Sequence, residues 1–135
     1  AGVPYDPELV RQGDFETQSG YKQMKSLLDS GKKFSAVFVA SDAVALGAYN
    51  AIREAGLTIP HDLSLVGFDD LPLSSFISPT LTTVRMPASE IAKNSCHLLM
   101  RLMKRDFPES RMISLPTKLI IRESTCELDE GRMFS

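Results

Sequence analysis

Two acidic residues stand close behind two hydrophobic, strand-like runs, and their type and spacing suit the binding of a small polar ligand. Asp42 follows the run Phe34–Ala40, and Asp69 follows the run Leu63–Phe68. A helix-length segment separates the two runs, which is the pattern of a β-α-β unit with parallel strands. Small ligands bind beyond the carboxyl ends of such strands, so Asp42 and Asp69 are the first candidates for a ligand site.

The elements that must position these acids alternate between helical and strand patterns along the chain. The run Phe34–Ala40 is continuously apolar, which is typical of a central parallel strand covered on both faces. Gly31 and Gly56 are expected to end two helices. The expected helices are 19–30, 42–55 and 89–105, and the expected strands are 34–40, 64–68, 81–84 and 113–121. This order predicts an α/β fold with a doubly wound parallel sheet.

The composition indicates one compact unit, or a piece of one, that does not bind nucleic acid by itself. The chain has 135 residues, of which 43% are hydrophobic and 24% charged, and its formal net charge is −2. Lys and Arg are scattered, so no basic face is expected to neutralise phosphates. No apolar run approaches the roughly 18 residues of a membrane span. Cys96 and Cys126 are too few for a disulfide framework and lack zinc-site spacing, which favours buried or reduced thiols in the cytoplasm.

An enzyme is not expected, and neither is a metal or cofactor site. The sequence has no nucleophile elbow, metal-binding helix motif or phosphate-cradling loop. His61 and His97 are expected to be structural or solvated. Acidic strand ends also hold Mg²⁺ in phosphotransfer domains, but there a positioned Lys or a further acid accompanies the pair. Here Leu71 and Pro72 follow Asp69 and Asp70 instead.

Short motifs in a fixed order connect this sequence with a known family. In chain order they are Gly13-Asp14-Phe15-Glu16, Ser19-Gly20-Tyr21, Ala40-Ser41-Asp42 with Ala45-Leu46-Gly47-Ala48, Ile59-Pro60, Leu65-Val66-Gly67-Phe68-Asp69-Asp70, Pro79-Thr80-Leu81-Thr82-Thr83-Val84 and Arg122-Glu123-Ser124-Thr125. Each motif is weak alone. Together, over Val10–Thr125, they resemble the C-terminal part of the effector-binding core of transcriptional regulators of the lactose-repressor/galactose-repressor family.

The resemblance implies a periplasmic-binding-protein-like fold of type I, in which two lobes joined by three crossovers enclose a small-molecule effector. Residues 1–126 would form part of this domain. About 1–79 and 120–126 would belong to the C-terminal lobe, about 84–119 would supply a crossover helix and strand of the N-terminal lobe, and 127–135 would be a flexible tail. The helix 89–105 would then lack its own sheet and leave its apolar stripe exposed unless a partner covers it.

The implied function is effector sensing and homodimerisation in a cytoplasmic, bacterial, sugar-responsive transcriptional regulator. A sugar or related metabolite would bind in the cleft between the lobes and control operator binding allosterically. A helix-turn-helix domain that is missing from this chain would contact the operator DNA. The alternative is the C-terminal part of a sugar-binding protein of a transporter, which shares the fold. The motifs at Pro79–Val84 and Arg122–Thr125 are more typical of the regulators.

The resemblance also implies roles for four ligand-site residues. Asp69 would reach into the cleft and accept hydrogen bonds from sugar hydroxyls, although an Asp in this position also commonly caps a turn. Phe15 would stack on the effector, or else pack in the core. Ser41 stands where relatives often carry Asn, which changes the donors offered to the ligand. Asp42 would contact the ligand or cap the following helix. Asp70 is expected to hold the loop.

A dimer seam is implied for the helix after the Ser-Asp motif and for the loop after the Gly-Phe-Asp-Asp motif. These map to Leu46 and Tyr49 on the helix, and to Phe76 and Ile77 in the loop. Phe76 and Ile77 lie among Pro and Ser residues, where an apolar pair is otherwise poorly explained.

Overall fold

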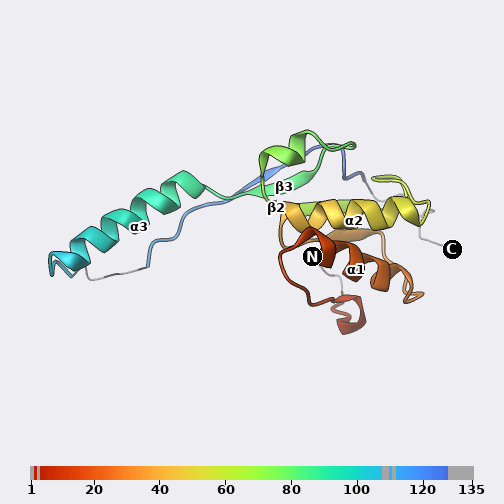
Figure 1. Ribbon diagram of the computed structural model, residues 1–135, viewed down its shortest axis with the longest axis horizontal. Helices are drawn as coiled ribbons and strands as arrows, with labels where there is room; N and C mark the ends of the chain where they lie inside the picture. Colours follow the sequence, from red (N-terminus) through yellow and green to blue (C-terminus); the bar gives the residue numbers. More distant parts are fainter. Residues whose placement is uncertain (1, 3, 108–109, 111, 128–135) are drawn as a thin grey trace.

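A four-stranded sheet in the order β1-β2-β3-β4 organises the chain. Figure 1 shows the computed structural model. The structure describes residues 2, 4–107, 110 and 112–127. Most of the expected tail 127–135 therefore lies outside the described residues. The elements are η1 (Pro7–Leu9), α1 (Thr17–Leu28), β1 (Ala36–Phe38), α2 (Asp42–Glu54), β2 (Ser64–Asp69), η2 (Pro72–Ser75), β3 (Thr82–Arg85), α3 (Ala88–Met103) and β4 (Lys118–Ile120).

The first three strands are parallel, which confirms the α/β class expected from the sequence. Val37 of β1 pairs with Leu65 of β2, and Gly67 of β2 pairs with Thr83 of β3. β4 pairs with β3 in the antiparallel direction. The strand expected over 113–121 is reduced to Lys118–Ile120, because only this part pairs with β3.

The core lies between α1, α2 and the sheet. Met24 and Leu27 of α1 and Ile52 of α2 are buried together with Leu63, Leu65 and Leu81 from the region of the sheet. Close helix packing depends on Gly47, where a Cβ atom would collide with the backbone of Thr17 on α1. The small residues of α2 thus admit α1 on one side as well as the sheet on the other. Tyr21 and Lys25 of α1 both bind the carboxylate of Glu54, which ties the far ends of these helices together.

The expectation that the run Phe34–Ala40 forms a covered central strand is wrong in this structure. β1 spans only Ala36–Phe38 and lies at the edge of the sheet, with β2 as its neighbour among the described strands. The Phe38 side chain is 62% exposed as a result. An apolar run shows what a strand can pack against, whereas the position of the strand depends on which neighbours are present.

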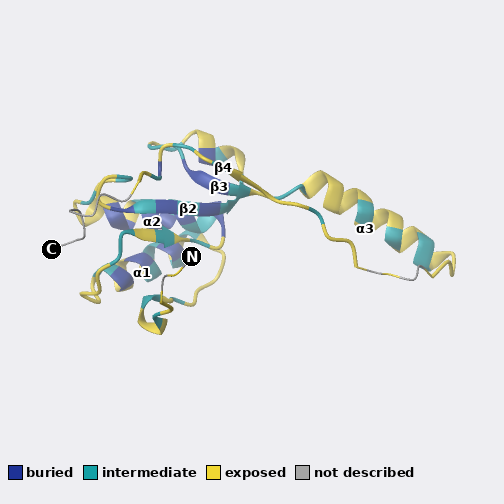
Figure 2. Cartoon of the chain, turned by 180° about the vertical axis from the view of Figure 1, so that it is seen from behind, coloured by how far each residue is buried: buried dark blue, intermediate teal, exposed yellow. Residues whose placement is uncertain are grey.

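α3 stands away from the rest of the chain on two extended segments (Figure 1). No residue of this helix is buried, and Figure 2 shows it mostly exposed in contrast to the body. Ile91 is 40% and Leu99 58% exposed. The exposed apolar stripe expected for this helix is therefore present.

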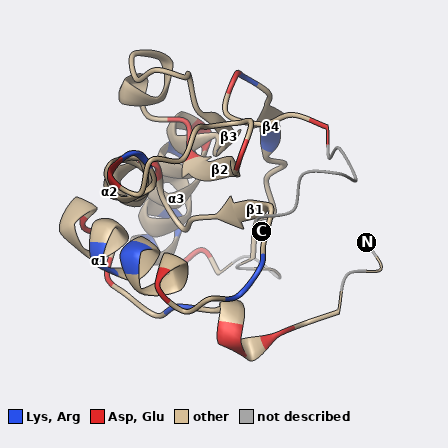
Figure 3. Cartoon of the chain, turned by 90° about the vertical axis from the view of Figure 1, so that its right-hand side faces the viewer, with Lys and Arg blue, Asp and Glu red and all other residues tan. Residues whose placement is uncertain are grey.

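Charged residues of both signs are spread over the described part of the chain. Figure 3 shows Lys and Arg interspersed with Asp and Glu along the elements. Within the described residues, no helix combines the length and the apolar character needed to cross a membrane.

Candidate functional site

The carboxyl ends of β1, β2 and β3 lie at one end of the sheet, and the amino ends of α1 and α2 lie beside them. Ser41 joins β1 to α2, Asp69 is the last residue of β2, and Arg85 is the last residue of β3. The Thr17 hydroxyl at the start of α1 donates to the Ala43 carbonyl in the first turn of α2, at 3.0 Å. This is the end of a parallel sheet at which small ligands bind.

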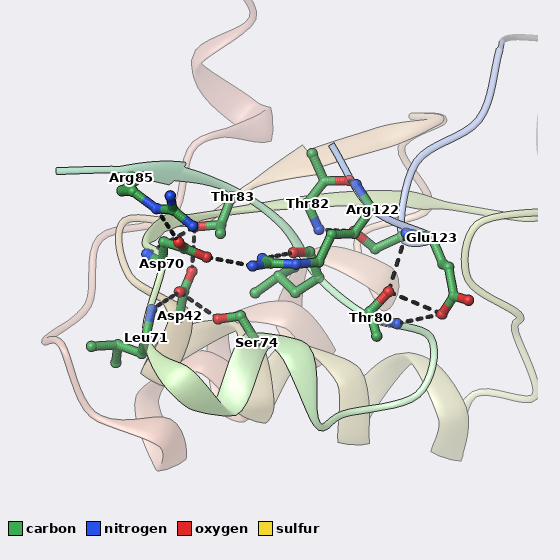
Figure 4. A network of polar contacts seen from close by, with 12 residues as sticks. Asp42, Asp70, Leu71, Ser74, Thr80, Thr82, Thr83, Arg85, Arg122 and Glu123 are labelled. Atoms are coloured by element: carbon green, nitrogen blue, oxygen red, sulfur yellow. Dashed lines mark hydrogen bonds and ion pairs between the residues drawn. The ribbon is translucent and has the colours of Figure 1, made fainter. Parts of the chain in front are cut away.

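Asp42 lies beneath this end of the sheet and is fully buried. Its Oδ2 atom accepts hydrogen bonds from the Leu71 amide at 2.8 Å and from the Ser74 hydroxyl at 2.5 Å (Figure 4). Its Oδ1 atom accepts one from the Thr83 hydroxyl at 2.6 Å. Gly67 makes room for the carboxylate, because a Cβ atom at that position would collide with Oδ1. Asp42 thus ties α2 to β3 and to the loop that follows β2.

This geometry differs from both roles considered for Asp42. The buried carboxylate has no exposed surface with which to contact a ligand. The helix cap is Ser41, whose hydroxyl oxygen accepts a hydrogen bond from the Val44 amide at 3.3 Å. Ser41 is itself only 6% exposed, beside the buried acid.

Asp70 is held between two arginines. Arg85 Nε donates to Asp70 Oδ2 at 2.5 Å, and Arg122 Nη2 donates to Asp70 Oδ1 at 2.6 Å (Figure 4). Burial raises the pKa of the Asp70 carboxyl, but the hydrogen bonds and charges of Arg122 and Arg85 outweigh it, so the pKa lies below its ordinary value. These contacts hold the loop, as expected from the sequence.

Asp69 differs from both neighbouring acids because its carboxylate makes no hydrogen bond within the described part of the chain. The side chain is partly buried at the end of β2. Burial raises the pKa of Asp69, and the negative charge of Asp42 raises it further. The turn-capping role is not observed, since η2 begins after Leu71 with no side-chain cap. A partly exposed carboxylate with free lone pairs can accept hydrogen bonds from a ligand.

Phe15 lies outside the core, in the loop that leads into α1. Its side chain is 70% exposed, which removes the core-packing alternative in this structure. The loop is fixed on both sides of the ring, because the Asp14 amide donates to the Ser19 hydroxyl at 3.1 Å and the Glu16 amide donates to the Asp14 carboxylate at 3.0 Å. Ser19 thus binds this loop from within the first turns of the helix, which begins at Thr17 and not at residue 19 as expected. In sequence, Phe15 lies two residues before Thr17, whose hydroxyl contacts α2.

Three of the four residues expected at a dimer seam lie around one groove beside α2, and the fourth, Phe76, precedes one of them in the chain. Leu46, Tyr49 and Ile77 line one groove with a volume of about 400 Å³. Phe76, next to Ile77, is 87% exposed. The Tyr49 hydroxyl donates to the Pro79 carbonyl at 2.8 Å, and burial raises the pKa of Tyr49 to about 12.

Sequence reasoning found the motif Arg122–Thr125 but assigned no role to its side chains. Arg122 binds Asp70, and Glu123 Oε2 accepts hydrogen bonds from the amide and hydroxyl of Thr80 at 2.9 and 3.0 Å. The Ser124 hydroxyl donates to the Leu65 carbonyl at 2.6 Å. An arginine directly after an apolar strand was the available signal, but its partner lies 52 positions earlier in the chain.

Comparison with known proteins gives consistent relatives for this chain. The family described as periplasmic binding protein-like domain matches residues 1–125. The chain is 40% identical over 124 residues to the HTH-type transcriptional repressor CytR of Escherichia coli (strain K12), covering 92% of this chain and 36% of the relative. It is 36% identical over 132 residues to the repressor PurR of Actinobacillus pleuropneumoniae serotype 3 (strain JL03), covering 96% of this chain and 39% of the relative.

Solved structures with the same fold include ligand complexes. The transcriptional regulator CelR in complex with cellobiose superimposes with a TM-score of 0.86 at 35% identity, covering 91% of this chain and 38% of that structure. A LacI family regulator from Enterococcus faecium with bound ribose has a TM-score of 0.73 at 35% identity, covering 87% and 43%.

The chain spans less than two fifths of the length of the two repressors, which are named as transcription regulators and not as enzymes. The chain belongs to the family of periplasmic binding protein-like domains, of the kind found in transcriptional regulators of the LacI family.

Proposed function

We propose that this chain is the C-terminal part of the effector-binding core of a transcriptional regulator that responds to a sugar or related metabolite. The observation that carries the proposal is the unpaired carboxylate of Asp69 at the carboxyl end of β2. A carboxylate accepts hydrogen bonds from adjacent sugar hydroxyls in charge-assisted form. The exposed Phe15 ring supports a sugar because its face packs against the C–H side of a pyranose.

The proposed ligand contacts are Asp69, Phe15 and Ser41, with Asp42 as the buried support beneath them. The Ser41 oxygen already accepts the capping hydrogen bond, so its hydroxyl would act toward the ligand as a donor. Cellobiose and ribose in two related regulators support a sugar as the class of effector.

The shape of the chain supports a division between two lobes. In this proposal, residues of about 1–79 and 120–126 form the C-terminal lobe, and about 84–119 belong to the N-terminal lobe. The exposed apolar stripe of α3 would then be covered by the remainder of the N-terminal lobe. Effector binding between the lobes would control a helix-turn-helix domain elsewhere in the protein.

We also propose that the intact protein is a homodimer in which Leu46, Tyr49, Phe76 and Ile77 lie at the seam. The groove lined by three of these residues and the exposure of Phe76 support an interface. A dimeric Lac repressor is among the similar structures, at 36% identity and a TM-score of 0.77. The transporter alternative shares the fold, but the relatives named above are regulators.

A thermal-shift screen of the intact protein tests the proposed function. The panel consists of D-ribose, cellobiose, sugar phosphates and purines. A ligand at about a hundred times its Kd adds about 2.7 kcal/mol to the free energy of unfolding, so a true effector raises Tm clearly. The expected result is a sugar that raises Tm in the wild type and much less in Asp69→Asn. An equal shift in both proteins would contradict the assigned site.

A further inference from the structure

The backbone at the end of β2 is strained at two consecutive positions. Asp69 has a φ of 109° and Asp70 a φ of 59°, and neither residue is glycine. Residues other than glycine rarely adopt positive φ, and such a conformation persists only where the surroundings hold it in place. The surroundings of these two residues therefore decide where the Asp69 side chain lies.

Contacts on both sides hold this turn, and none of them involves the Asp69 carboxylate. On one side, the Leu71 amide donates to the buried Asp42. On the other side, Arg85 and Arg122 bind the Asp70 carboxylate, and the Asp70 amide donates to the Thr83 hydroxyl at 3.4 Å. Asp69 thus takes its position from its neighbours.

Arg122 is the stronger of the two anchors. The Asp70 side chain is 7% exposed and that of Arg122 16%, whereas the Arg85 side chain is 54% exposed. Arg122 also donates through Nη1 to the Leu81 carbonyl at 2.7 Å, so its planar guanidinium is fixed at two points. The ion pair of Asp70 with the exposed Arg85 therefore stabilises the turn less than its ion pair with Arg122 does.

We propose that Asp70 is a positioning residue for Asp69, and that its ion pairs with Arg122 and Arg85 hold the strained turn so that the Asp69 carboxylate is presented at the open end of the sheet. This inference rests on the proposed ligand role of Asp69 and extends it to residues that the ligand need not touch. A carboxylate that is already fixed in its binding position loses less freedom when a ligand binds.

The test is a titration of the Asp69 side-chain carboxyl carbon by NMR, in the intact protein without any ligand. The variants are Asp70→Asn and Arg122→Gln. If either change releases the turn, Asp69 moves into water and away from Asp42. In both variants its pKa should then fall toward the value of a solvated aspartate, about 3.9.

The opposite charges of the two substituted residues separate positioning from simple electrostatics. Removal of the negative Asp70 would lower the pKa of Asp69 through charge alone, whereas removal of the positive Arg122 would raise it. A downward shift in both variants is therefore the signature of a released turn. Opposite shifts, or an unchanged titration, would overturn the positioning role.

Two further variants serve as controls. Arg122→Lys keeps the positive charge but offers one nitrogen in place of the two that bind Asp70 and Leu81. The pKa of Asp69 in this variant should lie closer to the wild-type value than it does in Arg122→Gln. Glu54→Gln breaks an exposed ion pair with Lys25 and should leave the titration of Asp69 unchanged. Urea denaturation curves at both ends of the pH range verify that each variant is folded.

The outcome is independent of the proposed function, because no ligand is present. If the titration shifts as expected but Asp69→Asn binds a sugar from the screen as tightly as the wild type does, the ligand role fails and the positioning role stands. If Asp69→Asn loses binding but the titration does not shift, the positioning role fails alone.

Discussion

Three aspartates at one end of the sheet have the same side chain and differ in what their oxygens contact. Asp42 accepts three hydrogen bonds and is fully buried. Asp70 pairs with two arginines, and Asp69 has no hydrogen-bond partner among the described residues. A ligand can therefore find free acceptor oxygens only on Asp69 within this group.

We expect Asp69→Asn to weaken effector binding without unfolding the protein. The amide keeps the shape but loses charge-assisted acceptance, worth about 1.5–3 kcal/mol for a hydrogen bond to a charged group. At 1.4 kcal/mol per decade, Kd for the sugar found in the screen should rise by about one to two orders of magnitude. Titration calorimetry measures this change. Asp29→Asn, an exposed acid after α1, is the matched control and should bind as the wild type does.

The stability provided by Asp70 should depend on pH in a defined direction. Its pKa is lowered in the folded state, so the ion pairs stabilise the protein at pH values above the pKa of the unfolded chain, about 3.9. This contribution is lost as pH falls through the lower pKa of the folded state. Urea denaturation should show Asp70→Asn less stable than the wild type by about 2 kcal/mol at pH 6. The difference should shrink well below pH 3.9, and a constant difference would contradict the ion-pair assignment.

Sequence reasoning identified the acids at the strand ends but did not separate their roles. Asp42 and Asp69 both follow apolar strands, so a local pattern treats them alike. They differ because Gly67 opens a space for the Asp42 carboxylate on the neighbouring strand. That contact joins positions distant in sequence and has no local signature. The strained turn at Asp69 and Asp70 likewise lies beside contacts that Asp70 makes with residues much later in the chain.

At the scale of elements, Asp42 joins α2 to β3 and to the loop containing η2. Replacement by Ala would leave two buried hydroxyls, of Ser74 and Thr83, and the partly buried amide of Leu71 without an acceptor. Each unsatisfied buried donor costs about 1–3 kcal/mol, so Asp42→Ala should lower the free energy of unfolding by about 3 kcal/mol or more. Urea denaturation followed by circular dichroism measures this loss.

The exposed Asp29 provides the control for this substitution as well. Asp29→Ala should change the free energy of unfolding by about 0.5 kcal/mol or less, as is usual at the surface. A similarly small loss for Asp42→Ala would show that the network does not support the fold.

The order of helices and strands could be predicted from the sequence, whereas the place and direction of each strand in the sheet could not. Periodicity located the three longer helices, and glycine stops marked the ends of two of them, since these signals are local. The apolar run around β1 indicated a strand correctly but not its place at the edge, where Phe38 is exposed. The direction of β4 was not foreseen either, because strand direction follows from the path of the whole chain.

At the scale of the molecule, the groove beside α2 leads to a prediction about assembly. Leu46→Lys together with Ile77→Lys places two charges among the apolar lining of this groove. A seam cannot readily bury unpaired ammonium groups, so the intact double variant should be monomeric. Sedimentation velocity measures the change. Asp29→Lys adds a lysine elsewhere and should remain dimeric, and a dimeric double variant would remove these residues from the seam.

The two extended segments that lead to α3 are bound to one carboxylate, in addition to the pairing of β3 with β4. Arg85 ends the outgoing strand β3, and Arg122 lies just after the returning strand β4. Both side chains are bound to the two oxygens of Asp70, the neighbour of the proposed ligand-contact residue. A rotation of α3 relative to the sheet would displace both segments at once. Each segment carries an arginine that is bound to the Asp70 carboxylate, so the displacement would also act on Asp70. The Asp70 carboxylate thus links both segments to the proposed ligand contact, Asp69.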